Sequence, residues 1–157
     1  MSASGVRWLE AACEDGPASA ALERVYAMID REVRERGPAC WASGRCCRFE
    51  AAGHRLFVTG LEAAYAVVRA FPGAVTTLTI EGARARGGCP FQEGNLCGAR
   101  EIRPLGCRVY FCDRSAARWQ QDLSERMLAG VRAIHDEQGI EYCYGEWREM
   151  LGLIVGP

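Results

Sequence analysis

The chain has 157 residues, of which 49% are apolar and 25% are charged, and these proportions are typical of a globular domain rather than a disordered chain. Its 19 basic residues are all arginines and face 20 acidic residues, and the resulting net charge of −1 excludes a broadly basic nucleic-acid-binding protein. No apolar run reaches the ~18 residues that a membrane span needs, and the first ten residues lack the pattern of a secretory signal.

The first predicted element is an amphipathic helix over residues 17–36. Its apolar residues, among them Leu22 and Ile29, recur at steps of three and four. Gly37 followed by Pro38 predicts its end, because glycine adopts the left-handed conformation that closes helices and proline cannot continue one. Residues 38–53, rich in cysteine and glycine, are expected to form a loop.

The middle of the chain predicts two strands and a helix. Residues 56–58 favour a short strand. Thr59 and Glu62 have the spacing of a capping box and predict a helix that runs to about Ala70. Residues 75–80 (VTTLTI) favour a strand because they are rich in β-branched side chains.

The second half predicts a hairpin and further helices. Cys89 and Cys97 flank a turn at residues 92–94 and are expected to lie on a small hairpin. Pro104 interrupts the chain before Cys107. A long helix is expected to run to about Gln138, capped by Asp113 or Ser115, and a last short helix is expected over residues 145–153.

These elements predict a mainly helical fold (α+β) in one domain over residues 1–157, with a short β-hairpin and a cysteine-rich metal-binding lobe. The cysteine-cluster region covers residues 38–113, and a C-terminal helical region covers residues 114–157.

Nine cysteines are the most informative feature of the composition. Their odd number and the missing export pattern favour a reducing cytoplasmic compartment, where clustered cysteines usually bind metal or take part in catalysis. Cys13 and Cys143 stand alone and are expected to act as small apolar residues. The other seven form two clusters and are the candidate metal ligands, of which four or more are expected to bind: Cys40, Cys46, Cys47, Cys89, Cys97, Cys107 and Cys112.

The spacing of these cysteines excludes several kinds of site. The chain contains no C-x-x-C pair, which excludes zinc ribbons, zinc knuckles and thioredoxin-type dithiols. The cysteine run of bacterial ferredoxins is also absent.

Two stretches resemble a known family. The segment Cys40-Trp-Ala-Ser-Gly-Arg-Cys46-Cys47 resembles the first signature of the YkgJ-like cysteine-cluster family. Cys89-Pro-Phe, then Cys97, then the run from Ile102 to Cys112 resembles its second signature. The resemblance covers about residues 38–113, and Ser43 stands where many members have another cysteine. It implies an iron–sulfur or zinc centre and no particular reaction.

Three functions are compatible with these residues. The first is an iron–sulfur protein of the [4Fe–4S] type in redox or maturation chemistry, acting as an oxidoreductase with a redox partner or as an accessory protein. The second is a structural zinc module that binds a protein partner. The third is a metal-free thiol switch. Neither nucleic acid nor membrane is expected as a partner.

Residues beside the cysteines are expected to support such a centre. Arg45, Arg48 and Arg108 are expected to neutralise its negative charge. His54 is expected to be a solvated loop residue, and His135 a cation in the last turn of a helix. Five aromatic residues are expected either to exclude water from the centre or to belong to the core: Trp41, Phe49, Phe91, Tyr110 and Phe111.

Overall fold

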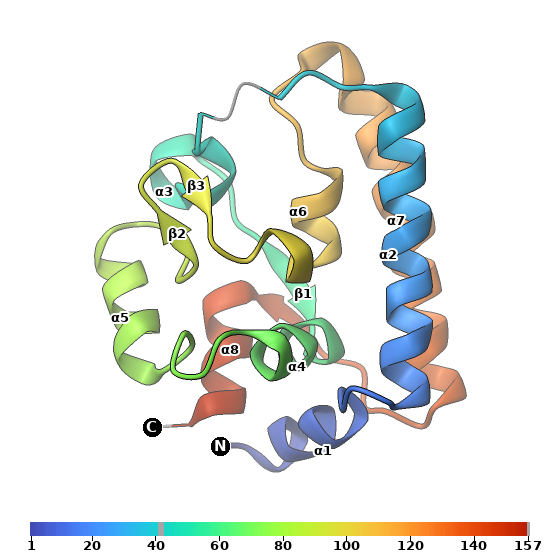
Figure 1. Cartoon of the computed structure of the whole chain (residues 1–157), viewed down its shortest axis with the longest axis vertical. Coiled ribbons are helices and arrows are strands. Elements are labelled where there is room, and N and C mark those ends of the chain that lie inside the picture. The colour runs from blue at the N-terminus through green and yellow to red at the C-terminus, as the bar shows by residue number, and fades with distance from the viewer. Residues whose placement is uncertain (41–42, 157) are drawn as a thin grey trace.

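Two long antiparallel helices form one side of the molecule in this computed structural model, which describes residues 1–40 and 43–156 (Figure 1). Helix α2 spans Pro17–Arg36, and Gly37 ends it with a φ of 61°. Helix α7 spans Ala117–Glu137. The predicted helix over residues 17–36 is confirmed at both ends. The predicted long helix is also confirmed, and Asp113 caps the short 3₁₀ turn η3 (Arg114–Ala116) that leads into it.

Apolar stripes hold these two helices together. Leu22, Tyr26 and Ile29 of α2 are buried, as are Leu123 and Val131 of α7. Such burial stabilises the fold by roughly 2 kcal/mol per large side chain.

Four shorter helices pack at the end of the molecule where both termini lie: α1 (Ala3–Ala11), α4 (Gly60–Arg69), α5 (Thr77–Ala85) and α8 (Trp147–Val155). The backbone N–H of Ser2 donates to the carbonyl of Leu153 over 2.9 Å, so the two ends of the chain meet. A Cβ atom at Gly60 would lie only 2.2 Å from the ring of Trp8, so only glycine lets α1 pack this closely on α4. Helix α1 was not predicted from the sequence.

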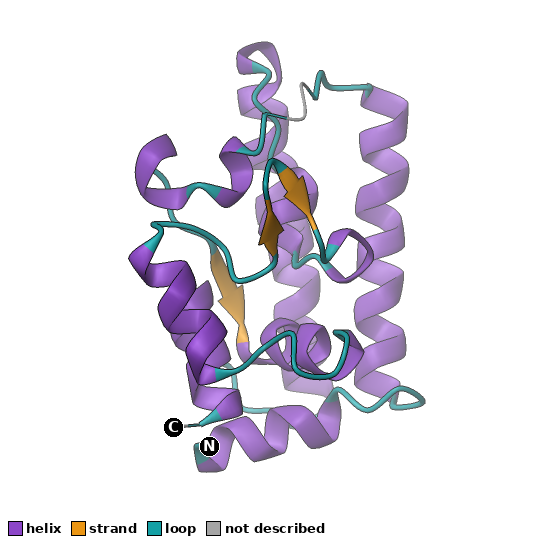
Figure 2. Ribbon diagram, turned by 60° about the vertical axis from the view of Figure 1, so that its left-hand side comes forward, coloured by secondary structure: helices purple, strands orange, loops and turns teal. Residues whose placement is uncertain are grey.

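Two small antiparallel sheets complete the fold. Strand β1 (Phe57–Thr59) pairs with β4 (Tyr144–Glu146), and β2 (Gln92–Glu93) pairs with β3 (Leu96–Cys97) in the hairpin shown in Figure 2. The predicted hairpin and the short strand near residue 57 are confirmed. The expected loop over residues 38–53 contains two short helical turns.

Short helical turns carry or flank most of the clustered cysteines: η1 (Arg45–Cys47), α3 (Phe49–Ala52), η2 (Arg100–Ile102) and α6 (Leu105–Val109). The mainly helical fold class with a small β-hairpin is therefore confirmed. Within the described ranges, no helix has the length and apolar character required to cross a bilayer.

The strand predicted over residues 75–80 is wrong, because most of this segment belongs to helix α5. The Thr76 hydroxyl accepts from the backbone N–H of Thr79, and the Thr79 hydroxyl accepts from the backbone N–H of Thr76. This reciprocal cap starts a helix that β-branched composition alone does not reveal.

The buried carboxylate of Glu62 joins three helices. One oxygen accepts from the N–H and the hydroxyl of Thr59 at 2.9 and 3.1 Å, which completes the predicted capping box of α4. The other oxygen accepts from the Tyr26 hydroxyl of α2 at 3.3 Å and from the N–H of Leu105, the first residue of α6, at 2.8 Å. Burial raises the pKa of Glu62, and these donors partly offset that effect.

Replacing Glu62 with Gln is expected to lower the free energy of unfolding by about 2 kcal/mol or more, because one amide –NH₂ then faces donors that it cannot satisfy. Urea unfolding of the full chain measures this loss. Glu23→Gln is the matched control, since Glu23 forms a half-exposed ion pair with Arg69 and should lose less than about 1 kcal/mol. Equal losses in the two variants would contradict the linking role of Glu62.

His135 differs from its predicted role as a helix-end cation. Its side chain is 1% exposed, and burial lowers its pKa, so the folded state favours the neutral ring. The ring lies 3.1 Å, through Nδ1, from the carbonyl of Glu141.

Acid is therefore expected to destabilise the fold through His135. The pKa of an unfolded histidine is about 6.5, so below that pH the unfolded chain binds a proton that the folded chain resists. The free energy of unfolding should fall between pH 7 and pH 5, by at most ~1.4 kcal/mol per pH unit from this residue. The slope should be smaller in His135→Gln, measured by urea unfolding at each pH, and an unchanged slope would contradict this account.

Candidate metal centre

Five of the seven predicted ligands come together between the hairpin and α6; we call Cys46, Cys47, Cys89, Cys97 and Cys107 the thiol cluster. Cys46 and Cys47 lie on η1, and Cys97 lies on β3. Cys89 precedes the hairpin, and Cys107 lies on α6. Segments far apart in the sequence therefore supply the five thiols.

Backbone contacts bring the two halves of the cluster together. The N–H of Cys89 donates to the carbonyl of Cys47 over 2.9 Å, and the N–H of Glu50 donates to the carbonyl of Gly87 over 3.2 Å. A Cβ atom at Gly88 would lie 3.0 Å from the Cys47 carbonyl oxygen, so the two segments pack without intervening side chains.

The thiols of the cluster influence one another's ionisation. Interaction with the Cys47 thiol lowers the pKa of Cys46, Cys97 and Cys89. Because Cys47 carries a single S–H proton, it can stabilise only one of these thiolates at a time. The pKa of Cys47 itself is raised because it acts as the donor. Desolvation raises the pKa of Cys107 well above the ordinary thiol value.

Backbone amides also donate to two of the sulfurs. The N–H of Phe91 donates to the sulfur of Cys89, and the N–H of Ala99 donates to that of Cys97. In both cases the donor lies two residues after the cysteine. Such hydrogen bonds stabilise the thiolate, which is the form that binds metal.

The positive charge near the thiols comes mainly from arginines that were not predicted. Arg103 lowers the pKa of Cys46 and Cys97, and Arg100 also lowers that of Cys97. The predicted Arg108 is instead held by Asp30 at 2.9 Å and by two backbone carbonyl groups. Arg48 donates to the side chain of Asn95.

Arg45 is the third arginine predicted to neutralise the centre. Its charge lowers the pKa of the Tyr110 hydroxyl, although burial raises that pKa overall. Arg103 and Arg100 are the arginines among the main causes that lower the pKa of Cys46 and Cys97, and the neutralising role of Arg45 stays a prediction.

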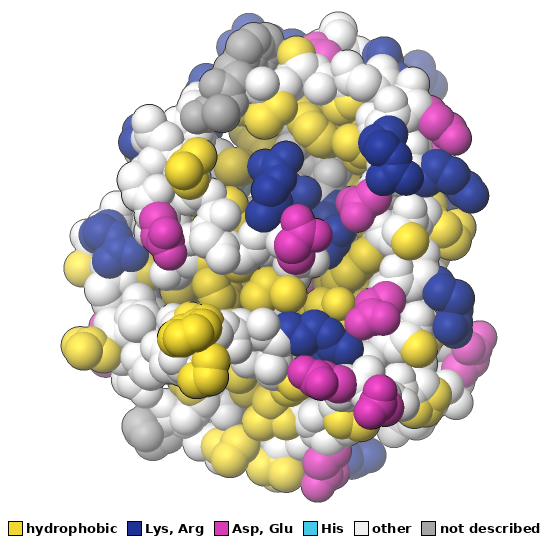
Figure 3. Space-filling view, viewed as in Figure 1, with side chains coloured by type: hydrophobic (Ala, Val, Ile, Leu, Met, Phe, Trp, Pro, Cys, Tyr) yellow, Lys and Arg dark blue, Asp and Glu magenta, His cyan; other side chains and the backbone are white. Residues whose placement is uncertain are grey.

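Two adjoining cavities together include all seven predicted cysteines in their walls. The smaller has a volume of about 20 Å³ and is lined by the thiol cluster. The larger has a volume of about 210 Å³, and its walls include Cys46, Cys47, Cys97 and Cys107, with Cys40 and Cys112 on the outer side. Figure 3 shows the molecule hollowed here between the hairpin and α2, with hydrophobic side chains in the floor and basic ones beside it.

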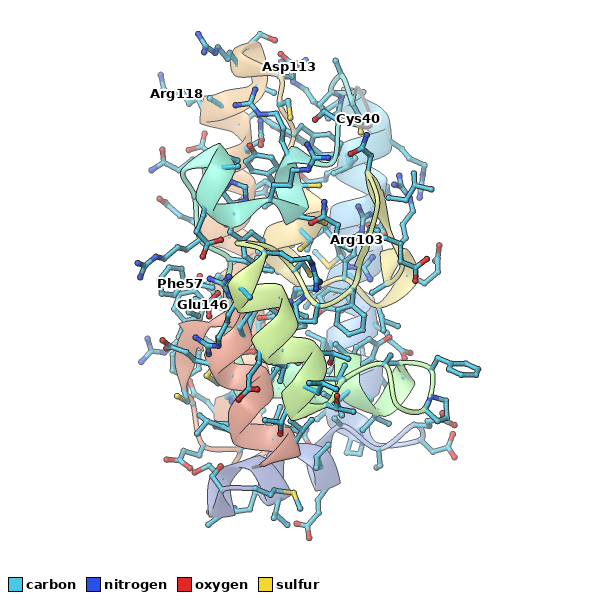
Figure 4. The ribbon with its side chains drawn as sticks, turned by 90° about the vertical axis from the view of Figure 1, so that its left-hand side faces the viewer. Cys40, Phe57, Arg103, Asp113, Arg118 and Glu146 are labelled. Atoms are coloured by element: carbon cyan, nitrogen blue, oxygen red, sulfur yellow. The ribbon has the colours of Figure 1, made fainter. Side chains whose placement is uncertain are left out.

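Cys40 and Cys112 lie outside the thiol cluster. Cys40 is exposed and lies toward the end of the molecule marked by Asp113, whereas Arg103 lies beside the hairpin (Figure 4). The sulfur of Cys112 lies 4.0 Å from the hydroxyl of Ser43. Of the two isolated cysteines, Cys13 is exposed and so does not pack as the small apolar residue that was predicted, whereas the half-buried Cys143 contacts Met150.

The aromatic residues near the cysteines divide between the two cavities. Phe49 and Phe91 line the smaller one, and Tyr110 and Phe111 line the larger. Trp147 of α8 also lines the smaller cavity, and its place in the sequence gives no sign of this. Trp41 lies outside the described residues.

His54 is half-buried rather than fully solvated. It stacks on Tyr110 with ring centroids 5.1 Å apart, and its Nε2 lies 3.2 Å from the carbonyl oxygen of Cys46. His54 therefore lies beside the thiol cluster, where its ring contacts the backbone carbonyl of Cys46.

The donor set suits a thiolate-bound metal in its chemistry. Zinc–thiolate and iron–sulfur centres require soft sulfur ligands, and N–H donors and nearby arginines stabilise the thiolate form of those ligands. In the ranges that the structure describes, however, no three His, Cys, Asp or Glu side chains are already arranged to hold a metal ion. Metal ligation by these cysteines therefore remains a prediction.

Comparison with known proteins finds no matching family model, no similar curated protein and no similar solved structure. The resemblance to the YkgJ-like family accordingly stays a prediction from the two cysteine signatures.

The thiol contacts predict unusual reactivity. In the reduced, metal-free chain, alkylation of Cys46 and Cys97 by iodoacetamide should have midpoints below the ordinary thiol pKa of about 8.5, because the thiolate is the reactive form. Cys47→Ala removes the hydrogen-bond donor, so both midpoints should rise toward about 8.5. Peptide mass spectrometry measures each site, and identical midpoints in the two proteins would contradict the role of Cys47.

Proposed function

We propose that this chain is a metal-binding protein whose clustered cysteines hold an iron–sulfur centre of the [4Fe–4S] type for redox or maturation chemistry. The observation that carries the proposal is the convergence of five thiols from three segments: η1, the hairpin with the residues just before it, and α6. Backbone N–H groups donate to two of these thiols, Cys89 and Cys97. Crowded thiolates repel one another, and a bound metal offsets that repulsion.

The space beside the thiols favours a cluster over a single ion. A tetrahedral zinc ion and a [4Fe–4S] cluster each take four thiolates, so the seven cysteines that line the two cavities can serve either centre. The larger cavity, of about 210 Å³, is lined by Cys40 and Cys112 as well as by four thiols of the cluster, and it has room for a multi-atom centre.

The residues around the cluster would support such a centre. When bound, an iron–sulfur cluster supplies one-electron transfer. Phe49, Phe91 and Trp147 would exclude water from its inner side. Arg103 and Arg100 would offset the negative charge of the thiolates.

The smaller cavity favours a second candidate, a structural zinc site. Its volume of about 20 Å³ suits one water-sized occupant, and its five thiols exceed the four that zinc requires. In that case the metal would hold η1, the hairpin and α6 together for a protein partner.

Cys97→Ser is expected to weaken metal binding by at least ~10-fold, because it removes a thiol that lines both cavities. Metal per chain after desalting measures the loss. Cys143→Ser is the matched control: it is also half-buried but lies outside both cavities, and it should keep the wild-type metal content. Full metal retention in Cys97→Ser would contradict the assignment.

Cys112→Ser separates the two candidate centres. A cluster in the larger cavity should lose metal in this variant, whereas a zinc ion held by the inner thiols should not. A wild-type chain without any metal would contradict both and support the metal-free thiol switch.

A further inference from the structure

The indole of Trp147 holds a buried hydrogen-bond donor with no conventional partner. The residue is 1% exposed, and its Nε1 has no hydrogen-bond partner among the described residues. A buried N–H without an acceptor costs roughly 1–3 kcal/mol, so such donors nearly always have a partner. An acceptor for the Trp147 N–H is therefore expected among the atoms beside the indole.

The ring is fixed where it lies. Trp147 is the first residue of α8, and its backbone N–H donates to the carbonyl of Leu56 over 2.8 Å. Its ring packs against Phe91 with centroids 6.0 Å apart. The guanidinium of the next residue, Arg148, donates hydrogen bonds to the carboxylate of Glu146 over 2.9 Å and to the carbonyl of Gly88 over 3.4 Å. The start of α8 is thus tied to the backbone immediately before Cys89.

The candidate acceptor on that side is the sulfur of Cys89. Trp147 and Cys89 line the same small cavity, and both side chains are buried. The sulfur of Cys89 also receives the backbone N–H of Phe91, so the indole would be a second N–H donor to the same atom. Sulfur accepts such hydrogen bonds most strongly as a thiolate.

We propose that Trp147 is a positioning residue of the metal centre, whose indole N–H donates to the sulfur of Cys89 and fixes that sulfur as a ligand. The metal part of this inference rests on the proposed function, whereas the N–H···S contact does not. Partners of this kind typically contribute 10–100-fold to metal affinity, and hydrogen bonds to cluster sulfurs tune the reduction potential.

Trp147→Phe tests the inference because it keeps an aromatic ring and removes only the N–H. The variant should bind metal, release it to a chelator about 10- to 100-fold faster than the wild type, and, with an iron–sulfur centre, have a more negative reduction potential. Trp8→Phe is the matched control: Trp8 is equally buried, and its N–H donates to the carbonyl of Glu141 over 2.9 Å, away from the thiols. Equal release rates in the two variants would overturn the proposal.

A second measurement keeps the inference testable if the wild-type chain holds no metal, an outcome that would defeat the proposed function alone. In the ¹⁵N-correlated NMR spectrum, Trp147→Phe identifies the Trp147 indole signal. That signal should move in Cys89→Ala and stay in place in Cys143→Ala, while the Trp8 signal stays in place in both and reports an intact fold. An unmoved Trp147 signal in Cys89→Ala would overturn the proposal.

Discussion

A single buried carboxylate, that of Glu62, sets the relative positions of α2, α4 and α6. Removing a charge from water is costly, and donors from Thr59, Tyr26 and Leu105 partly offset that cost here. Since α6 carries Cys107, the same carboxylate also determines where that thiol lies. Glu62 is thus one link between the helical framework and the candidate metal centre.

The thiol cluster depends on a second set of contacts, in which backbone groups rather than side chains bring the cysteines together. The bond from the N–H of Cys89 to the carbonyl of Cys47 joins segments separated by more than forty residues. The crowding that results destabilises free thiolates. Backbone amide donors, arginines and the indole of Trp147 each stabilise the thiolates and so reduce this repulsion. A bound metal would reduce it most strongly. Stability and metal binding are therefore expected to be coupled in this protein.

Local signals in the sequence predicted much of the fold, and tertiary contacts account for what they missed. The ends of α2 and the start of α4 were predictable because Gly37, Thr59 and Glu62 act on neighbouring backbone groups. Helix α5 was mistaken for a strand because its cap uses two threonines. The seven candidate cysteines were found by spacing, but their division into an inner five and an outer pair was not. Arg103 and Trp147 reach the thiols only through packing.

The proposed iron–sulfur centre can be tested on the wild-type chain itself, purified without oxygen. The measurement is its iron, zinc and acid-labile sulfide content, together with its visible spectrum. Iron and sulfide in equal amounts and a brown protein are expected. Colourless protein with neither iron nor sulfide would contradict this proposal, and zinc in that sample would identify the structural alternative.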